Sequence, residues 1–357
     1  LTLLSGPINI SGVFRQGRIA EYSKDCHGVK PLSFSNGSNM AENTKRGVIF
    51  EEVEEDYSGQ RLDNFLMSRI KGAPRSLIYR IIRKGEVRVN KGRSKPDYRI
   101  ITGDVVRIPP VRVREEGEAP PVPEKMATNI ESAILYEDDH LLAVNKPRGM
   151  AVHGGSGISL GLIEALRVIR PDCKRLELVH RLDRDTSGVI LVAKKRSALL
   201  ALHEMLRRKS GMQKRYLALV HGVWPKHIKE VKAPLLKGEL KSGERIVRVS
   251  QEGKACHTRF SLERRFEGYT LLNAEPVTGR THQIRVHCQF AGHAIVGDEK
   301  YASDIELRQS RSQGSKRMFL HAFSLRFKHP KTEEVLKIEA PLDGAFNEYL
   351  EVLTPIN

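Results

Sequence analysis

Two short amphipathic helices are predicted near the start of the organised sequence. Apolar side chains recur at helical spacing in two segments, and Lys71-Gly72 and Gly85 end them. Pro74 suits the first turn of the second helix. The apolar stripes are Leu62, Phe65, Leu66 and Ile70 in the first segment, and Leu77, Ile78, Ile81 and Ile82 in the second.

Extended segments follow these helices. Residues 87–89 alternate as a strand, residues 90–92 have the composition of a turn, and residues 104–108 form a second strand pattern. Helices and strands together predict a small domain at residues 48–110.

A different pattern begins beyond a proline-rich segment. Residues 109–127 contain five prolines, an acidic cluster and almost no apolar periodicity, so we expect residues 111–127 to be a semi-extended linker. Beyond it, β-rich runs and helical segments alternate, which predicts an α+β domain at residues 128–357 around a mixed, largely antiparallel β-sheet. The β-rich runs are Ala133–Tyr136, Leu141–Val144, Val189–Ala193 and Tyr216–Val220, and the helical segments are Gly161–Arg170 and Ser197–Arg208.

The first residues of the chain lack such patterns. Residues 1–39 mix Ser, Gly and scattered charges and do not resemble a signal peptide. Organised sequence begins after Met40, so we expect translation to start there naturally. Residues 1–47 are accordingly expected to be upstream sequence or a disordered extension.

The net charge of the chain indicates which kind of partner it binds. The 357 residues include 60 Lys and Arg against 43 Asp and Glu, a formal charge of +17, which favours a polyanionic partner through counterion release and electrostatic steering. Nucleic acid is the first expectation and an anionic membrane the second, although no stretch reaches the roughly 18 to 20 apolar residues of a spanning helix. The four cysteines form no CxxC pair, so the sequence favours a reducing, cytoplasmic compartment.

The small domain is especially basic. Residues 61–108 hold 13 Lys or Arg and 4 Asp or Glu. A solvated charged surface is the ordinary explanation, but cations crowded on two helices and the next strand favour an RNA-binding face. Base stacking is not expected, because Phe65 and Tyr79 are predicted core residues. The candidate RNA contacts are Arg69, Lys71, Arg75, Arg80, Arg83, Lys84 and Arg88.

Two polar clusters in the larger domain lie next to apolar strands, the first directly after a strand and the second directly before one. Asn145 and Lys146 end the strand at residues 141–144, where loops commonly carry functional groups. The nonapeptide HRLDRDTSG at residues 180–188 precedes a buried strand, and its last glycine permits a close approach or a positive φ. Salt bridges and turn caps that merely hold this loop are the alternative to a catalytic role.

A third cluster is PVTGRTHQIRVH at residues 276–287. Within it, residues 281–287 alternate as a strand, which could direct Arg285 toward an aspartate from elsewhere. His282 and His287 are five residues apart without an acidic third ligand, so the spacing does not indicate a metal site. The expected strand faces are Thr281, Gln283 and Arg285 on one side and His282 and Ile284 on the other.

These clusters resemble a known enzyme family. From about Gly47 to its end, the chain is similar to the large-subunit ribosomal RNA pseudouridine synthases of the RluA family, for which HRLDRDTSG is a highly specific signature. The small domain resembles the alpha-L RNA-binding motif through RLDNFL, SLIYRIIRKGEVRVNKGR and GDVVRI. The remaining family motifs are NKPRG with the following VH, QKRYLALV at Gln213–Val220, GRTHQIRVH at Gly279–His287 and GHAIVGDEKY at Gly292–Tyr301.

The resemblance implies an isomerase that converts uridines of 23S ribosomal RNA to pseudouridine by base flipping, without a cofactor or metal. It also implies a role in ribosome biogenesis, with ribosomal RNA or a large-subunit assembly intermediate as partner, and we expect a monomer without membrane association. By motif position Asp183 is the catalytic aspartate, Arg285 its partner, Tyr216 the stacking tyrosine, Ile284 the aliphatic residue beneath the uracil, and Arg181 the side chain that fills the vacated stack. His180, Asn145, Lys146 and Arg280 are further expected substrate contacts.

The chemistry of the reaction is consistent with these roles. Ionised Asp183 could attack the anomeric carbon, remove a proton from the 2′ carbon or attack the uracil ring, and the sequence leaves all three routes open. A neighbouring Arg285 would favour the carboxylate, whereas desolvation would oppose it. Flipping costs a few kcal/mol, which Arg181 would partly recover.

Two other functions are compatible with parts of the pattern. A ribosome-assembly protein would need RNA binding but no catalysis. A hydrolytic glycosidase would need two carboxylates placed for acid and base work. Asp183 and Asp185 are the only neighbouring pair in the signature.

Overall fold

The computed structural model describes residues 47–70, 72–111, 121–154, 160–173, 175–208, 211–239 and 245–356. The predicted extension up to residue 46, the candidate RNA contact Lys71, and residues 112–120 of the predicted linker lie outside these ranges.

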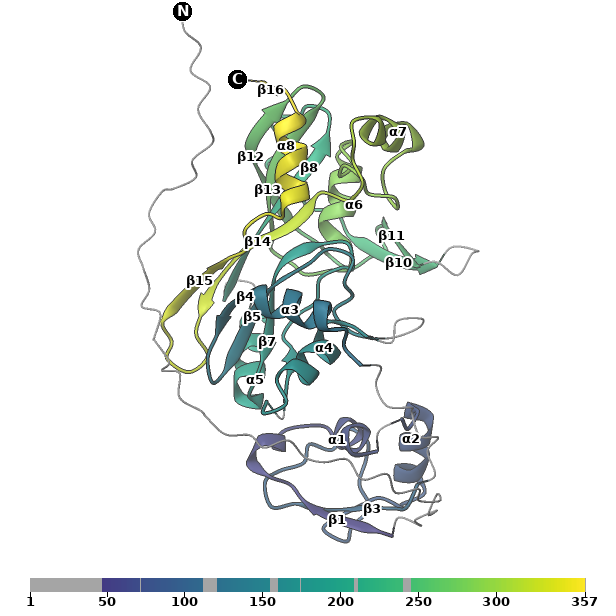
Figure 1. The fold of residues 1–357 in the computed structure, drawn as a ribbon. Helices are drawn as coiled ribbons and strands as arrows, with labels where there is room; N and C mark the ends of the chain where they lie inside the picture. Colours follow the sequence, from purple (N-terminus) through teal and green to yellow (C-terminus); the bar gives the residue numbers. More distant parts are fainter. Residues whose placement is uncertain are drawn as a thin grey trace, which may run out of the picture. The chain divides into compact units, whose positions relative to one another are not determined.

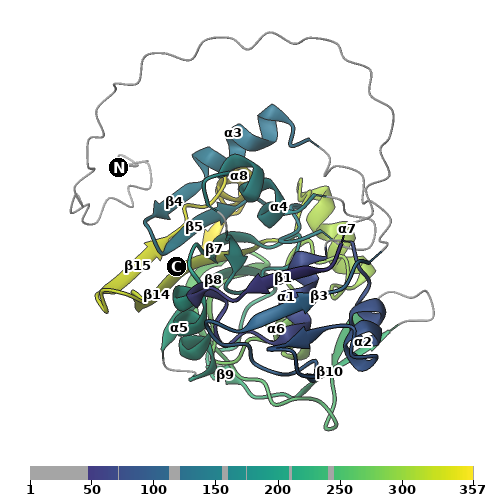
Figure 2. The ribbon, with the colours of Figure 1, turned by 90° about the horizontal axis from the view of Figure 1, so that it is seen from below.

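A three-stranded antiparallel sheet and two helices form the small domain (Figures 1 and 2). Both helices lie on one face of the sheet, and both predicted apolar stripes pack into the core between them. The strand order is β1-β3-β2. The pattern predicted every element except the first strand. The elements are β1 (Ile49–Glu52), α1 (Leu62–Arg69), α2 (Arg75–Arg83), β2 (Arg88–Val89) and β3 (Val105–Ile108), with a 3-10 turn at Glu55–Tyr57.

A large sheet forms the centre of the second domain, in the order β16-β12-β13-β8-β14-β7-β5-β4. It is mixed, because β7 and β14 are parallel whereas β5 and β7, β8 and β14, and β8 and β13 are antiparallel. The predicted mixed, largely antiparallel sheet is thereby confirmed. The main strands are β4 (Ile134–Glu137), β5 (Leu141–Lys146), β7 (Ser187–Ala193), β8 (Met212–His221), β12 (Thr258–Phe266), β13 (Tyr269–Pro276) and β14 (Leu320–Lys328).

Shorter strands extend the sheet at its margins. β6 pairs with β7, β9 with β12 and β15 with β14, while β10 and β11 form a separate hairpin. These strands are β6 (Glu177–Leu178), β9 (Glu230–Val231), β10 (Leu235–Glu239), β11 (Arg245–Val249), β15 (Val335–Glu339) and β16 (Pro355–Ile356).

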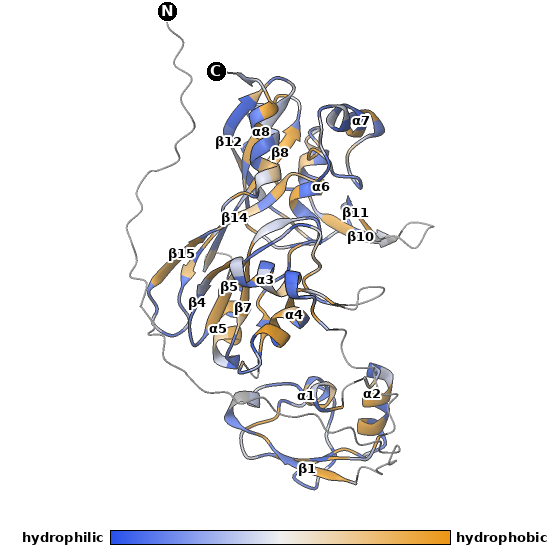
Figure 3. Cartoon of the chain, viewed as in Figure 1, coloured by the Kyte–Doolittle hydropathy of each residue, from blue (hydrophilic) through white to orange (hydrophobic). Residues whose placement is uncertain are grey.

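Helices cover both faces of the sheet. Alternate residues of β5 and β7 contribute to two different apolar clusters, one completed by α3 and α4 and the other by α5. In the same way, β8 contributes Ala218 and Val220 to a cluster with α6, and Leu217 and Leu219 to a cluster with α8. This two-sided burial explains why β5 and β7 are hydrophobic almost throughout, as the orange strands in Figure 3 show. The helices are α3 (Glu124–Ser132), α4 (Leu162–Ile169), α5 (Arg196–Arg207), α6 (Gln283–Phe290), α7 (Asp304–Ser312) and α8 (Gly344–Val352).

Two sequence predictions are wrong. The semi-extended linker was predicted to reach residue 127, but α3 begins at Glu124 directly after Pro123. The predicted strand at residues 281–287 is a helix instead, because α6 begins at Gln283. All residues from Gln283 to Cys288 are buried. The alternation of polar and apolar residues there therefore does not separate a buried face from an exposed one, and it does not indicate a strand. Ile284 and Cys288, which are four residues apart, face the apolar cluster as helix periodicity requires.

None of the helices in the described ranges is both long enough and apolar enough to cross a bilayer.

Candidate active site

A pocket of about 480 Å³ collects residues from three of the family motifs, HRLDRDTSG, QKRYLALV and GRTHQIRVH, whereas NKPRG and GHAIVGDEKY contribute none of its lining residues. It lies in the larger domain where the loop before β7, strand β8 and the segment from Pro276 to α6 converge. Asp183 is its one acidic side chain among the residues that the structure describes, and it faces several cations. The charged and titratable lining residues are His180, Arg181, Asp183, Arg207, Lys214, Tyr216, Arg280, His282 and Arg285.

The loop that carries Asp183 is fixed where β7 begins. A Cβ on Gly188, whose φ is +108°, would lie 2.2 Å from the carbonyl oxygen of Ala322, so only glycine allows β7 and β14 to approach this closely. Next to it, the hydroxyl of Ser187 lies 2.8 Å from Nδ1 of the buried His321. The sequence prediction of a close approach at Gly188 is confirmed, and the loop that carries Asp183 ends at a rigid anchor.

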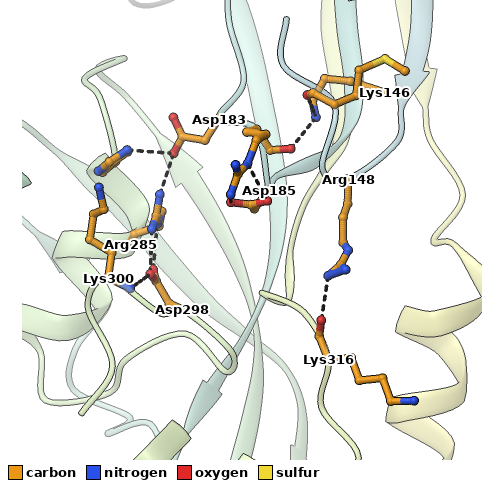
Figure 4. A network of polar contacts seen from close by, with 11 residues as sticks. Lys146, Arg148, Asp183, Asp185, Arg285, Asp298, Lys300 and Lys316 are labelled. Carbon is orange, nitrogen blue, oxygen red and sulfur yellow. Dashed lines mark hydrogen bonds and ion pairs between the residues drawn. The ribbon is translucent and has the colours of Figure 1, made fainter. Parts of the chain in front are cut away.

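Lys146 holds the other side of this loop. Its side chain is fully buried, and Nζ donates to the carbonyl oxygens of Pro147 and Met150 at 2.9 Å and of Arg184 at 3.1 Å (Figure 4). Burial lowers the pKa of Lys146 to about 7, although the charges of nearby Asp185 and Asp183 oppose the shift. Lys146 therefore ties two loops together and does not line the pocket as a substrate contact.

Asn145 also points elsewhere, because its Nδ2 donates to the carbonyl oxygen of Pro341 at 3.0 Å. Asp185 pairs with its exposed neighbour Arg184 at 3.2 Å and is absent from the pocket lining. Of the two aspartates in the signature, only Asp183 faces the pocket. Among the described residues, the pocket has no second carboxylate of the kind that a glycosidase needs.

Arg285 links Asp183 to a second carboxylate, that of Asp298 (Figure 4). Its Nη1 lies 3.2 Å from Oδ2 of Asp183, while Nε and Nη2 each donate to Asp298 at 2.7 Å. Burial by itself lowers the pKa of Arg285, but the hydrogen bonds and charges of the two aspartates outweigh it and raise the pKa above its ordinary value. A permanently charged guanidinium therefore faces Asp183 from a fixed direction.

His282 lies near the same carboxylate oxygen of Asp183. Its backbone is left-handed, with φ 54°, directly before α6, and its Nε2 lies 3.7 Å from Oδ2 of Asp183. Nδ1 lies 2.7 Å from the hydroxyl of Tyr301, which in turn accepts from the amide of Val247 at 3.1 Å. Burial lowers the pKa of His282 even though Asp183 opposes the shift, so the ring is neutral at pH 7. Arg285 is consequently the permanent counter-charge of Asp183.

Gln283 fixes the segment that leads into α6. Its side-chain oxygen accepts from the hydroxyl of Thr278 at 2.7 Å and from the amide of Arg280 at 3.1 Å, and its Nε2 donates to the carbonyl of His257 and the hydroxyl of Thr258. All donor and acceptor groups of this buried amide are thus engaged. His287 is likewise structural, since its ring contacts Thr258 Oγ1 and the carbonyl of Ala233.

An aromatic ring and an aliphatic side chain give the pocket apolar walls. Tyr216 on β8 and the buried Ile284 on α6 both line it, together with Leu320. Burial and the charge of Asp183 raise the pKa of Tyr216 well above its usual value of 10, so its hydroxyl is neutral at physiological pH. These walls can hold a planar, uncharged ring between them.

The positive residues of the pocket differ in exposure. Arg181 and Arg280 are exposed and line it, as predicted, whereas Lys214 is partly buried and its pKa is lowered by burial. His180 lines the pocket too, but its Nε2 accepts from the amide of Leu191 at 3.1 Å, and burial lowers its pKa to about 4. His180 therefore supports the strand more directly than it could contact a ligand.

Sequence reasoning missed three parts of this site. Asp298 and Tyr301 lie within GHAIVGDEKY, which was noticed only as a motif, and Lys214 lies within QKRYLALV. An acid directly after a glycine in a motif without an assigned role was the available signal for Asp298. No cluster of three His, Cys, Asp or Glu residues that could hold a metal ion occurs among the residues described.

In the small domain, most predicted RNA contacts are exposed. Arg75, Arg80, Arg83 and Lys84 lie on or next to α2 and reach solvent. Arg69 differs, because it pairs with Glu51 and its guanidinium lies 4.3 Å from the ring of Tyr57. Arg69 is thereby engaged within the domain.

Comparison with known proteins gives a consistent result. A family model described as RNA pseudouridylate synthase matches residues 140–290, and a model described as S4 domain matches residues 60–106. Ribosomal large subunit pseudouridine synthase C of Pasteurella multocida (strain Pm70) is 61% identical over 303 residues, which cover 84% of this chain and 92% of the relative. The protein of the same name from Escherichia coli (strain K12) is 60% identical over 305 residues, covering 84% and 95%.

Two solved human structures share the fold. Human RNA Pseudouridylate Synthase Domain Containing 4 superposes with a TM-score of 0.54 and 25% identity, covering 64% of this chain and 95% of its own. Human RNA Pseudouridylate Synthase Domain Containing 1 superposes with a TM-score of 0.51 and 26% identity, covering 65% and 90%.

Proposed function

Because the chain belongs to the RluA family of pseudouridine synthases, with an S4 domain ahead of the synthase domain, we propose that it converts specific uridines of 23S ribosomal RNA to pseudouridine. The observation that carries this proposal is the geometry of Asp183. It is the one acid among the described residues of the pocket, and it lies 3.2 Å from a guanidinium that Asp298 holds in place.

The reaction is an isomerisation and needs no co-reactant. The bond between C1′ and N1 breaks, the uracil turns, C5 bonds to C1′, and the proton of C5 is lost while N1 gains one. The carboxylate of Asp183 acts as nucleophile at C1′, as base at the 2′ carbon or as nucleophile at the uracil ring, and all three routes begin with the same side chain. Arg285 faces that carboxylate with a permanent positive charge, its Nη1 lying 3.2 Å from Oδ2 of Asp183.

The freed uracil must stay in the site while it turns. Tyr216 and Ile284 supply the two apolar surfaces between which a neutral ring can rotate without exchanging with solvent. The neutral hydroxyl of Tyr216 avoids adding a second negative charge beside Asp183.

Access to the site requires the uridine to leave its stack. Arg181, exposed at the pocket, is the residue we assign to the vacated space, where its planar guanidinium can stack on neighbouring bases. Arg207, Lys214 and Arg280 supply positive charge for the flanking phosphates. The exposed cations of α2 in the S4 domain add affinity for folded RNA.

The experiment that tests this function is pseudouridine mapping. Purified protein is incubated with unmodified 23S RNA transcript, and with 16S transcript as control, and pseudouridines are located by chemical labelling and mass spectrometry. We expect pseudouridine at a few positions of 23S RNA and none in 16S RNA. Free uracil released without pseudouridine would indicate a glycosidase, and the absence of both products would contradict the proposal.

A further inference from the structure

The sheet of the S4 domain has one face that the helices leave uncovered. Its inner face, with Val89, Val106 and Ile108, packs in the core against α1 and α2. On the outer face, Phe50 of β1 lies opposite Arg107 of β3, and Arg107 lies opposite Arg88 of β2. Directly paired residues of neighbouring strands project on the same side of a sheet, so these three side chains form a row across it.

The aromatic member of this row is strongly exposed. Phe50 is 66% exposed, and Val105, in the next paired row, is 40% exposed. A surface hollow of about 690 Å³ is lined by Phe50, Arg88, Asn90, Lys91, Val105 and Arg107. Part of β1 accordingly has the orange of hydrophobic residues in Figure 3.

The two arginines of the row are fixed but not neutralised. Nε of Arg88 donates to the carbonyl of Gly85 at 2.7 Å, and Nη1 of Arg107 donates to the carbonyl of Glu86. Within the described ranges, neither guanidinium forms an ion pair with a carboxylate. Both cations are therefore held against the sheet with the rest of their donors available. The one acid in the adjoining row, Glu52, lies opposite Val105 at the other end of β1.

We propose that this outer face binds an unpaired nucleotide of the RNA, with the base stacked on Phe50 and the adjoining phosphates bound by Arg107 and Arg88. An exposed ring on a sheet, flanked by cations on neighbouring strands, offers both components that single-stranded RNA recognises. Strand spacing places the Cα atoms of Arg107 and Arg88 about 5 and 10 Å from the Cα atom of Phe50, both on the same side of β1.

This site was not predicted from the sequence, where base stacking was not expected because Phe65 and Tyr79 were predicted core residues. Phe65 is indeed buried, but Phe50 belongs to the strand that the pattern did not predict. The site also differs from the cationic surface of α2, which lies on the helical side of the domain. A strip of unpaired RNA rather than an apolar protein surface fits it best, because the hollow combines one ring with three cations.

The inference rests on the proposed RNA substrate, but its test does not need turnover. The affinity of the full chain for a fluorescently labelled, unstructured 12-nucleotide RNA is measured by anisotropy for the parent and for Phe50→Ala, Phe50→Leu and Phe50→Trp. The matched control is Ile101→Ala, at an exposed apolar residue of the same domain outside the row. A transcript bearing 5-iodouridine is cross-linked to the parent, and the modified peptide is identified by mass spectrometry.

Stacking predicts that Phe50→Ala and Phe50→Leu each weaken binding about tenfold, whereas Phe50→Trp retains it and Ile101→Ala has no effect. Arg107→Gln should reduce the slope of log Kd against log salt by about one. The cross-link should fall within the peptide that contains Phe50. Equal affinity of Phe50→Ala and the parent, or full retention by Phe50→Leu, would overturn the inference. A change in oligomeric state of Phe50→Ala without a change in RNA affinity would also overturn it, in favour of a protein interface.

Turnover separates the two proposals. Ile101→Ala should keep the parental rate of pseudouridine formation, because Ile101 belongs neither to the row nor to the pocket around Asp183. If the parent formed no pseudouridine, the proposed function would fail whatever the binding data showed. If the parent were active and Phe50 had no effect on affinity, only the nucleotide site would fail.

Discussion

Asp298 holds Arg285 by two hydrogen bonds of 2.7 Å, which occupy Nε and Nη2 and leave Nη1 directed at Asp183, 3.2 Å away. The side chain of Asp298 is fully buried and that of Arg285 is 10% exposed, so this pair is shielded from solvent. The orientation of the counter-charge in the active site is therefore set by a residue that does not line the pocket.

Removing the charge of Asp298 should impair catalysis more than binding. Asp298→Asn keeps the size and shape of the side chain but offers Arg285 one acceptor oxygen in place of two. The guanidinium of Arg285 should therefore turn toward Asp183 and alter the position of the Asp183 carboxylate. We expect kcat to fall about 10- to 100-fold, as small misplacements of reacting groups do, with the Kd for RNA within about twofold of the parent. Single-turnover pseudouridine formation and anisotropy measure the two quantities.

The neighbouring Glu299 provides the control. Its side chain is 79% exposed and pairs with Arg311, so Glu299→Gln should match the parent in both measurements. Equal kcat for Asp298→Asn and Glu299→Gln would contradict a positioning role for Asp298.

Arg181 should increase kcat/KM only on RNAs in which the target base has to leave a stack. With Arg181→Ala, we expect kcat/KM to fall about 10- to 100-fold on a target uridine in a base-paired stem, because the few kcal/mol of unstacking are no longer partly recovered. On the same uridine in an unstructured oligonucleotide the loss should be less than about threefold. Arg184→Ala, a change at an exposed arginine of the same loop outside the pocket, should affect neither substrate. Equal losses on both RNAs for Arg181→Ala would rule out the stacking role.

His321 should make the loop anchor sensitive to acid. Burial lowers its pKa to about 4 from 6.5, while Nδ1 contacts Ser187 and Nε2 contacts the carbonyl of Ala340. A histidine with a lowered pKa contributes stability that is complete above pH 6.5 and is lost as the pH falls toward 4, since the unfolded chain then binds more protons.

The test compares free energies of unfolding at several pH values. Between pH 6.5 and 4.5 the parent should lose about 2 kcal/mol more than His321→Gln, which keeps a donor and an acceptor but does not titrate. His227→Gln, at an exposed histidine, should follow the parent. Parallel curves for the parent and His321→Gln would show that His321 does not govern acid stability.

The exposed cations of α2 should bind phosphate without reading sequence. Arg80→Gln and Arg83→Gln should each weaken binding to 23S fragments and unrelated folded RNAs alike, and each should reduce the salt slope by about one. Lys331→Gln, at an exposed position between β14 and β15, should leave the slope unchanged. An effect confined to one RNA sequence would contradict simple phosphate contact.

The sequence predicted helices and strands well where an element buries one face and exposes the other, because its apolar residues then recur with the period of that element. The stripes of α1 and α2 and the glycine stops were correct, and so was the close approach at Gly188. The pattern failed at residues 283–288, because burial on all sides removes the contrast that distinguishes a helix from a strand. It also missed β1, whose residues are mostly exposed.

The sequence predicted several of the residues that line the candidate site, but not the contacts that hold them in place. The motifs indicated that Asp183, Arg285 and Tyr216 would meet, and they do line one pocket. No residue pattern could indicate that Lys146 would turn inward to bind three carbonyl groups, or that Asp298 would face the distant side of Arg285. Both are long-range contacts that depend on how loops fold back on the sheet.

The central claim is that Asp183 performs the chemistry and Asp185 does not. Its most direct test is the amount of pseudouridine formed in 23S RNA by Asp183→Asn and Asp185→Asn under single-turnover conditions, with the Kd for the RNA measured in parallel. We predict at least a 1,000-fold loss of rate, about 4 kcal/mol, for Asp183→Asn with unchanged Kd, and a rate within about threefold of the parent for Asp185→Asn. Substantial pseudouridine formation by Asp183→Asn, or a comparable loss in Asp185→Asn, would contradict the assignment.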